Sequence, residues 1–218
     1  MFVAAMRHKP NLKANITLTV MTLNRLSTGQ KIALWTIALV IIDQVVKLMI
    51  NAYMVPGDRI SVFPWFELCY VENPGFAFGM EISDSSGGAD WGKIVLSLFR
   101  MVMIGAIIYG IRYLLKRRPD TPKGVLVGAV LILAGAIGNM VDSMFYGMFI
   151  DYQDGGFLTG KVIDMIHLPL FRWDNPPAFL DFLVGSDGYF FGAVFNIADA
   201  YISVAVVYLV IFQYKFFK

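Results

Sequence analysis

The amino-acid sequence predicts an all-α integral membrane protein with four transmembrane helices, a small β-rich segment on the outer side, and an outer loop between the third and fourth helices. Hydrophobic residues make up 57% of the 218 residues and charged residues only 16%, whereas soluble domains carry about 25% charged residues. Four stretches are apolar enough to cross a bilayer, and the segments that join them alternate in charge.

The four apolar stretches account for the predicted transmembrane helices, because each is close to the ~20 residues that a span needs. The first stretch contains Asp43 and Lys47 and is longer than the apolar core of a cleavable signal peptide, so we expect it to be retained. The four predicted spans are Ile32–Met54, Ile94–Leu115, Gly124–Met144 and Val194–Phe217.

The charge of the joining segments predicts the orientation. Lys and Arg gather before the first span, between the second and third, and after the fourth, whereas Asp and Glu dominate residues 55–93 and 145–193. Since positively charged flanks stay in the cytoplasm, we expect both termini inside and the two acidic segments outside. Residues 1–30 then form a cytoplasmic segment and residues 31–218 one membrane domain. The formal net charge of +2 gives no indication of a nucleic-acid partner.

The two outer segments differ in their sequence pattern. Residues Ile60–Met80 are aromatic, partly alternating, and interrupted by Pro and Gly, which is typical of short strands at a membrane surface. Residues 151–192 are rich in Gly, Pro and aromatic residues, so we expect an irregular and partly interfacial segment there.

Polar residues gather near the outer ends of the last two spans. Asn139 and Asp142 lie near the end of the third span, and Asn196 and Asp199 near the start of the fourth. An ionisable residue at such depth is a candidate functional residue. Asp199 is the hardest to explain structurally, because no Lys or Arg lies within one helical turn and a lone buried carboxylate is costly.

The other polar residues have structural explanations that the sequence leaves open. Asp43 and Lys47, four residues apart in the first span, can form an ion pair that only fixes helix packing. Asn139 and Asn196 can join helices through hydrogen bonds, and Asp142 can brace the chain that leaves the third span.

Several chemistries fit the sequence poorly. The single cysteine, Cys69, excludes an intrachain disulfide and a cysteine-based zinc site. His167 follows Asp164 by three residues, but there is no HExxH array, no GxSxG elbow and no Gly-rich phosphate loop. What remains is carboxylate chemistry, in which two aspartates share one proton and act as base and acid on a water molecule.

Five short motifs, in this order, resemble the lipoprotein signal peptidase (signal peptidase II) family, a group of bacterial membrane aspartyl peptidases. Each motif is weak alone, but all five stand on the expected spans and sides. They are DQVVK (residues 43–47), NPGFAFG (73–79), GNMVD (138–142), VIDM (162–165) and FNIAD (195–199).

The resemblance implies four transmembrane helices with a small periplasmic β-rich cradle and a periplasmic loop between helices 3 and 4, in a longer-looped branch of the family. It implies cleavage of prolipoproteins on the amino side of the diacylglyceryl-modified cysteine, in the inner membrane, without a metal or organic cofactor. Sensitivity to globomycin is implied as well. The expected partners are these precursors and the lipid bilayer, with the chain acting as a monomer.

The resemblance also implies the site residues. Asp164 and Asp199 correspond to the catalytic pair. Substrate-binding or supporting roles fall to Asn73, Gly75, Asn139, Asp142, Asn196, Asp43 and Lys47.

Two departures from the family pattern bear on the site. Many members continue the GNxxD motif with arginine, where this chain has Ser143; we hypothesise that Arg100, inside the second span, supplies the missing charge. In shorter members the first catalytic aspartate lies nine residues after the motif's last residue, which here is Asp151. Local pattern and apolar flanks favour Asp164 instead, and Asp151 remains the alternative.

Two other functions explain part of the pattern. A small proton-coupled carrier also buries acidic and basic residues, but it predicts acids spread over the membrane depth and a repeated architecture. A non-catalytic membrane assembly factor would keep the spans, yet it has no need of two aspartates in one outer pocket.

Overall fold

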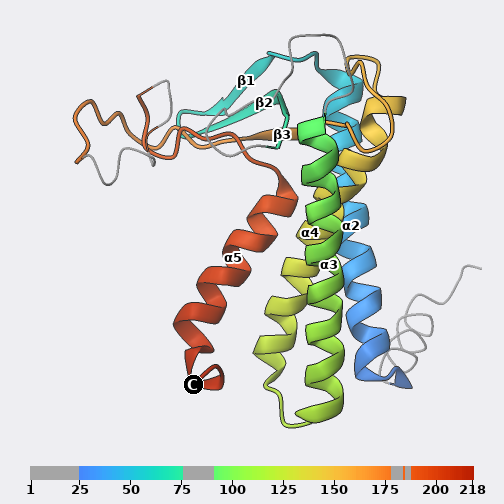
Figure 1. Ribbon diagram of the computed structural model, residues 1–218. Helices are drawn as coiled ribbons and strands as arrows, with labels where there is room; N and C mark the ends of the chain where they lie inside the picture. The colour runs from blue at the N-terminus through green and yellow to red at the C-terminus, as the bar shows by residue number, and fades with distance from the viewer. Residues whose placement is uncertain (1–24, 76–90, 178–183, 185–187) are drawn as a thin grey trace, which may run out of the picture.

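The computed structural model describes residues 25–75, 91–177, 184 and 188–218. Four helices stand side by side and a small antiparallel sheet lies across one end of them (Figure 1). The elements in chain order are α2 (Thr28–Tyr53), β1 (Arg59–Phe63), β2 (Phe66–Asn73), α3 (Trp91–Arg117), α4 (Lys123–Phe149), β3 (Val162–His167), α5 (Ile197–Phe212) and a short 3-10 helix, η3 (Tyr214–Phe216).

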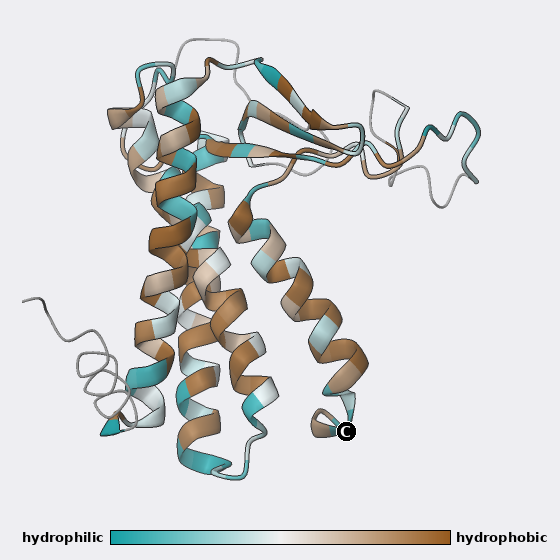
Figure 2. Ribbon diagram, turned by 180° about the vertical axis from the view of Figure 1, so that it is seen from behind, coloured by the Kyte–Doolittle hydropathy of each residue, from teal (hydrophilic) through white to brown (hydrophobic). Residues whose placement is uncertain are grey.

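Helices α2, α3 and α4 are long and apolar enough to cross a membrane, as the first three predicted spans require. Hydrophobic residues run along all four helices, and hydrophilic residues gather at the end of the bundle away from the sheet (Figure 2). Helix α5 is apolar but has only 16 residues, which corresponds to about 24 Å of helix. It is shorter than the predicted fourth span, because Asn196 caps its start and the chain turns into η3 after Gln213.

The predicted short strands between residues 60 and 80 are β1 and β2. The expectation of an irregular segment after α4 was wrong for residues Val162–His167, which form β3. This strand pairs antiparallel with β2, so β2 is the central strand of the order β1-β2-β3. The hydrogen bonds to β2 make this segment a strand. Its short, apolar sequence does not by itself indicate a strand.

A β-bulge in β2 determines which side chains face the bundle. Leu68 pairs with Ile166 and Val71 with Asp164, so three steps along β2 match two steps along β3. One extra residue in a strand moves the side chains that follow it to the other face of the sheet. The bulge therefore brings the end of β2 into the register at which Asn73 faces the same side as Asp164.

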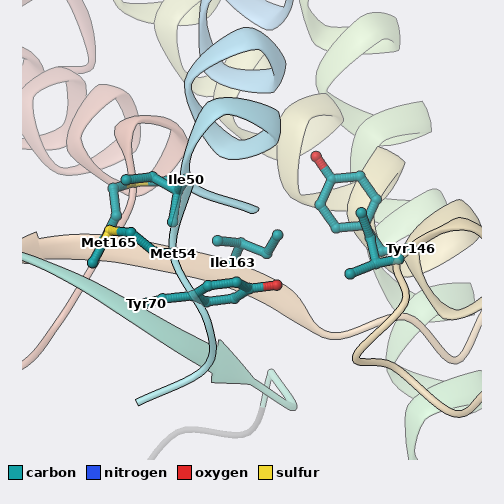
Figure 3. Close-up of a cluster of buried hydrophobic side chains, with 7 residues drawn as sticks. Ile50, Met54, Tyr70, Tyr146, Ile163 and Met165 are labelled. Carbon is teal, nitrogen blue, oxygen red and sulfur yellow. The ribbon is translucent and has the colours of Figure 1, made fainter. Parts of the chain in front are cut away.

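Two apolar clusters hold the fold together. One joins the sheet to the helices and contains Ile50, Met54, Tyr70, Ile163 and Met165 together with Tyr146 of α4 and Ile150, the residue that follows this helix (Figure 3). The other lies among α2, α3 and α4 and contains Ile32, Ile111, Val130 and Leu133. The first cluster fixes the sheet over the end of the bundle, and the polar site lies at the same junction.

Glycines in α4 allow its neighbours to approach closely. A Cβ atom at Gly128 would lie 2.7 Å from Leu209 of α5, and one at Gly138 would lie 2.6 Å from a carboxylate oxygen of Asp43 in α2. Small residues at such contacts let membrane helices pack backbone to backbone. Helix α4 is thus the central helix, with α2 and α5 drawn against two of its sides.

Candidate active site

Asp164 and Asp199 come from separate elements that meet where the sheet joins the bundle. Asp164 is on β3 and only 1% exposed, and Asp199 is in the first turn of α5 and partly buried. The two carboxylates are close enough to influence each other electrostatically. The structure therefore brings together the two aspartates that the motifs single out.

Asn196 connects the two aspartates directly. Its side-chain Nδ2 donates to Asp164 Oδ1 over 2.6 Å, and its Oδ1 accepts from the backbone N–H of Asp199 over 2.9 Å. Asp199 in turn accepts from the backbone N–H of Asn196 at 3.4 Å, which completes a reciprocal helix cap. One buried amide therefore starts α5 and orients Asp164 at the same time.

The second oxygen of Asp164 is held by a residue of the neighbouring strand β2. Asn73 Nδ2 donates to Asp164 Oδ2 over 2.8 Å, and Asn73 Oδ1 accepts from the backbone N–H of Gly75 over 2.7 Å. Gly75 has a φ of 91°, a left-handed conformation that favours glycine. The remainder of that motif, residues 76–79, lies outside the described residues.

Asp199 is linked to the interior of the bundle through Asn139. Asn139 Nδ2 donates to Asp199 Oδ1 over 2.7 Å, and its Oδ1 accepts from Lys47 Nζ over 3.0 Å. Asp199 thus accepts an N–H donor on each of its two carboxylate oxygens.

Lys47 lies between two aspartates. Its Nζ is 2.9 Å from Asp43 and 2.7 Å from Asp142, and all three side chains are fully buried. Asp43 also accepts from the backbone N–H of Ala198 in α5 over 3.0 Å. A buried ion pair of this kind contributes little net stability, but removing one partner leaves an uncompensated charge. The triad joins α2 to α4, and Asn139 connects it to Asp199.

Arg100 lies at the same junction. A residue that replaces the family's arginine has to be near position 143, and Arg100 contacts Ser143 there. Its guanidinium donates a short hydrogen bond to the hydroxyl of Ser143, which donates to the carbonyl of Asn139. Arg100 is also close enough to Asp142, Asp164 and Asp199 to interact with them electrostatically. A cation from α3 thus occupies the surroundings of position 143.

Asp151, the alternative partner for Asp199, is placed differently. It is exposed in the turn that follows α4, and among the described residues it has no hydrogen bond or ion pair with the network around Asp199. The insert after it folds back onto α4, where the backbone N–H groups of Leu158 and Gly160 donate to the carbonyls of Met144 and Ser143.

The pKa of Asp164 is raised to about 7, first by burial and then by the neighbouring negative charge of Asp199. The hydrogen bonds from Asn73 and Asn196 oppose this shift. A carboxyl group with a pKa near neutrality is suited to general acid–base work, because both protonation states are accessible.

Sequence reasoning missed Gln44, although the signal was present as a polar residue beside Asp43 within the first span. Its Nε2 donates to Asp142 over 2.8 Å and its Oε1 accepts from the hydroxyl of Tyr146 over 3.1 Å. Gln44 therefore satisfies an oxygen of the buried triad that Lys47 does not reach.

A possible metal-ligand group lies on the sheet, apart from the aspartates. Glu67, Cys69 and His167 have ligand atoms within 4.8 Å of one another. Glu67 accepts from His167 Nδ1 at 2.9 Å, and the guanidinium of Arg59 lies 3.5 Å from the same carboxylate. That guanidinium opposes a metal cation there. Asp164 and His167, three residues apart on β3, point to opposite faces and do not form a ligand pair.

The comparisons with known proteins agree with the motifs. The family model described as signal peptidase (SPase) II matches residues 35–215. A lipoprotein signal peptidase of Porphyromonas gingivalis (strain ATCC 33277) is 37% identical over 202 residues, which cover 87% of this chain and 85% of that protein. A lipoprotein signal peptidase of Amoebophilus asiaticus is 34% identical over 181 residues, with coverages of 79% and 72%.

Two solved structures, both described as bacterial membrane enzymes, have the same overall fold. One has a TM-score of 0.56 and 24% identity over 85% of this chain and 88% of its own. The other has a TM-score of 0.55 and 24% identity, with coverages of 84% and 91%. The resemblance carried by the five motifs is confirmed by the match over residues 35–215 and by relatives that are more than one third identical to this chain over the aligned residues. The chain belongs to the signal peptidase II family, whose members are aspartic peptidases of the bacterial membrane.

Proposed function

We propose that this chain removes the signal peptide from prolipoproteins, cleaving on the amino side of the diacylglyceryl-modified cysteine with Asp164, Asp199 and a water molecule. The observation that carries the assignment is the pair of hydrogen bonds of the Asn196 side chain, which donates to the Asp164 carboxylate and accepts from the backbone N–H of Asp199 at the start of α5. The family match supports the peptidase reaction and does not favour a proton-coupled carrier.

The two aspartates have different surroundings, which suggests different roles. Asp199 accepts two N–H hydrogen bonds and serves as the base that takes a proton from water. Asp164, whose pKa is about 7, serves as the acid that polarises the scissile carbonyl and then protonates the leaving amine. General acid–base steps of this kind contribute roughly 10²–10⁴-fold each to the rate. No metal or organic cofactor takes part in this proposal.

Four residues position the pair rather than react. Asn73, Asn139 and Asn196 donate to the two carboxylates, and Lys47 orients Asn139 by donating to its side-chain oxygen. Asp43 and Asp142 hold Lys47 in place from α2 and α4. Arg100 offsets the negative charge of Asp142, Asp164 and Asp199, and in this role it replaces the arginine that is absent at Ser143.

The proposed orientation places the site near the periplasmic face of the inner membrane, with both termini in the cytoplasm and α5 as a fourth, short span. Lys116 and Arg117 in the last turn of α3 support it, because they lie at the end of the bundle opposite the sheet. Every group of the site comes from one chain, so a monomer contains the complete machinery. The lipid-modified precursor then approaches from the bilayer, and globomycin competes for the same site.

The proposal is tested with purified protein in detergent and a diacylglyceryl-modified precursor. Asp164→Asn and Asp199→Asn should each abolish cleavage while the folded protein is retained. Asp151→Asn is the matched control, because Asp151 is an exposed aspartate in the segment that joins α4 to β3, and this variant should cleave at the wild-type rate. Cleavage by Asp164→Asn together with loss of activity in Asp151→Asn would show that the pair is misassigned. Cleavage by all three variants would refute the aspartyl mechanism.

A further inference from the structure

A groove lies at the end of the bundle opposite the sheet, far from the two aspartates. It has a volume of about 870 Å³ and is formed by the first turns of α2, the end of α3 with the following turn, and the first turns of α4. Cavities of about 300–1,000 Å³ hold small organic ligands. The catalytic proposal makes no use of this space.

The walls of the groove are apolar and its rim is basic. Its apolar lining includes Trp35, Leu39 and Val130, and its charged lining residues are Lys31, Arg118 and Lys123. The lining includes no Asp or Glu. A groove with apolar walls and three cations at one end matches an amphiphile with an anionic head group.

The three cations are available for a ligand. Among the described residues none of them forms an ion pair with a carboxylate. The guanidinium of Arg118 lies 5.0 Å from the centre of the Phe216 ring, a contact that orients it and leaves its N–H groups without a carboxylate. Guanidinium and ammonium groups in this arrangement bind phosphate oxygens.

The length of the groove fits one leaflet of a bilayer. Its lining extends along α2 from Thr28 to Leu39, which corresponds to about 16 Å of helix and roughly half of the ~30 Å hydrocarbon core. An acyl chain laid along Trp35 and Leu39 would therefore keep its phosphate at the level of Lys31. Basic pockets between helices at a membrane surface are typical sites for anionic lipid head groups.

We propose that this groove binds an anionic phospholipid, with the phosphate held by Lys31, Arg118 and Lys123 and one acyl chain lying against Trp35. The proposal is independent of the peptidase assignment. It gives α2, α3 and α4 a shared ligand at the end of the bundle where they are not joined by the sheet.

The first experiment measures lipid retention by the full-length protein in neutral detergent, using native mass spectrometry. Phosphatidylglycerol and phosphatidylcholine with identical acyl chains are compared. The variant K31Q/R118Q/K123Q should bind phosphatidylglycerol roughly a hundredfold more weakly, since each basic residue contributes about fivefold. The control R112Q/K116Q/R117Q removes three basic residues of α3 that do not line the groove. It should bind as the wild type does.

Equal losses in both variants would overturn the proposal, because they would show attraction to a basic surface and not to this groove. An unchanged affinity in the first variant would overturn it as well.

A second experiment locates the acyl chain. In a protein whose Trp65, Trp91 and Trp173 are replaced by Phe, phosphatidylglycerol with brominated chains should quench the fluorescence of Trp35, and the triple variant of the rim should lose this quenching. If Trp35 is not quenched in the protein with an intact rim, another group occupies the groove, such as the chain's own residues 1–24, and the lipid proposal fails.

Discussion

Asn196 donates its side-chain amide to Asp164 over 2.6 Å from the residue that immediately precedes helix α5. The helix cap and the orientation of a buried carboxylate therefore depend on one side chain. Because the same residue serves a structural and a chemical purpose, the two can be separated only by a substitution that preserves one of them.

Asn196→Ser should separate them. Serine is a good helix cap, but its side chain is too short to reach Asp164, so stability should stay near the wild-type value while kcat falls at least tenfold. Asn196→Ala loses the cap as well and should lower the free energy of unfolding by about 1 kcal/mol further. Thermal unfolding in detergent and precursor cleavage measure the two effects. Equal activity in Asn196→Ser and the wild type would show that the bridge to Asp164 is dispensable.

The pH dependence of cleavage should reflect Asp164. Its pKa of about 7 means that the protonated acid is lost as pH rises through neutrality, so kcat should decline on the alkaline side with an apparent pKa near 7. Asn73 donates to Asp164, and this hydrogen bond lowers the pKa. Asn73→Ala should therefore move the alkaline limb to higher pH while reducing the maximum rate. An unshifted limb would assign it to another group.

The same shift affects stability in a defined direction. An aspartate has a pKa of about 3.9 in the unfolded chain, and Asp164 has one of about 7 in the folded protein. Between these values the folded state binds the additional proton, so the contribution of Asp164 to stability decreases as pH rises from about 4 to 7. Asp164→Asn should make the unfolding temperature less dependent on pH in that window.

Exchanging the residues at positions 100 and 143 tests the origin of the positive charge. Arg100→Ala should reduce cleavage at least tenfold, because the guanidinium next to Ser143 is lost. The double variant R100A/S143R restores a guanidinium to the space that Arg100 vacates and should recover part of the activity. Arg112→Ala removes an exposed arginine of the same helix and serves as the control. Full activity in Arg100→Ala would refute the hypothesis that Arg100 takes the role of the family arginine that is absent at Ser143.

Gly138→Ala should disturb the contact between α4 and α2. The added Cβ atom would lie 2.6 Å from a carboxylate oxygen of Asp43, which is fixed by Lys47, so we expect a loss of about 1–3 kcal/mol in stability. Gly105→Ala is the matched control, because a Cβ atom there meets no other atom within 4 Å. Thermal unfolding of both variants measures the difference. Equal unfolding temperatures would mean that α2 and α4 can separate without cost.

The sequence predicts the parts of the structure that depend on composition and on local pattern. Long apolar runs identify α2, α3 and α4, and the depth of Asn139 and Asp142 follows from their place near the end of a run. The site residues Asp164 and Asp199 are indicated by their motifs, and the structure places them together.

Features that depend on distant partners are not evident in the sequence. Strand β3 is a strand because β2 lies beside it, and the bulge that aligns Asn73 with Asp164 exists only in the pairing of the two. Gln44 is part of the network because Asp142 and Tyr146, about a hundred residues away, meet it.

The cap at Asn196 has a consequence for biosynthesis. The chain emerges from the ribosome with its N-terminus first, so Asp43, Lys47, Asn73 and Asp164 are all made before the segment that contains Asn196 and Asp199. Until that last segment has entered the membrane, Asp164 lacks one of its two amide donors and has no carboxylate partner. Under the catalytic assignment proposed above, the chain acquires its activity only when the last helix docks against α4.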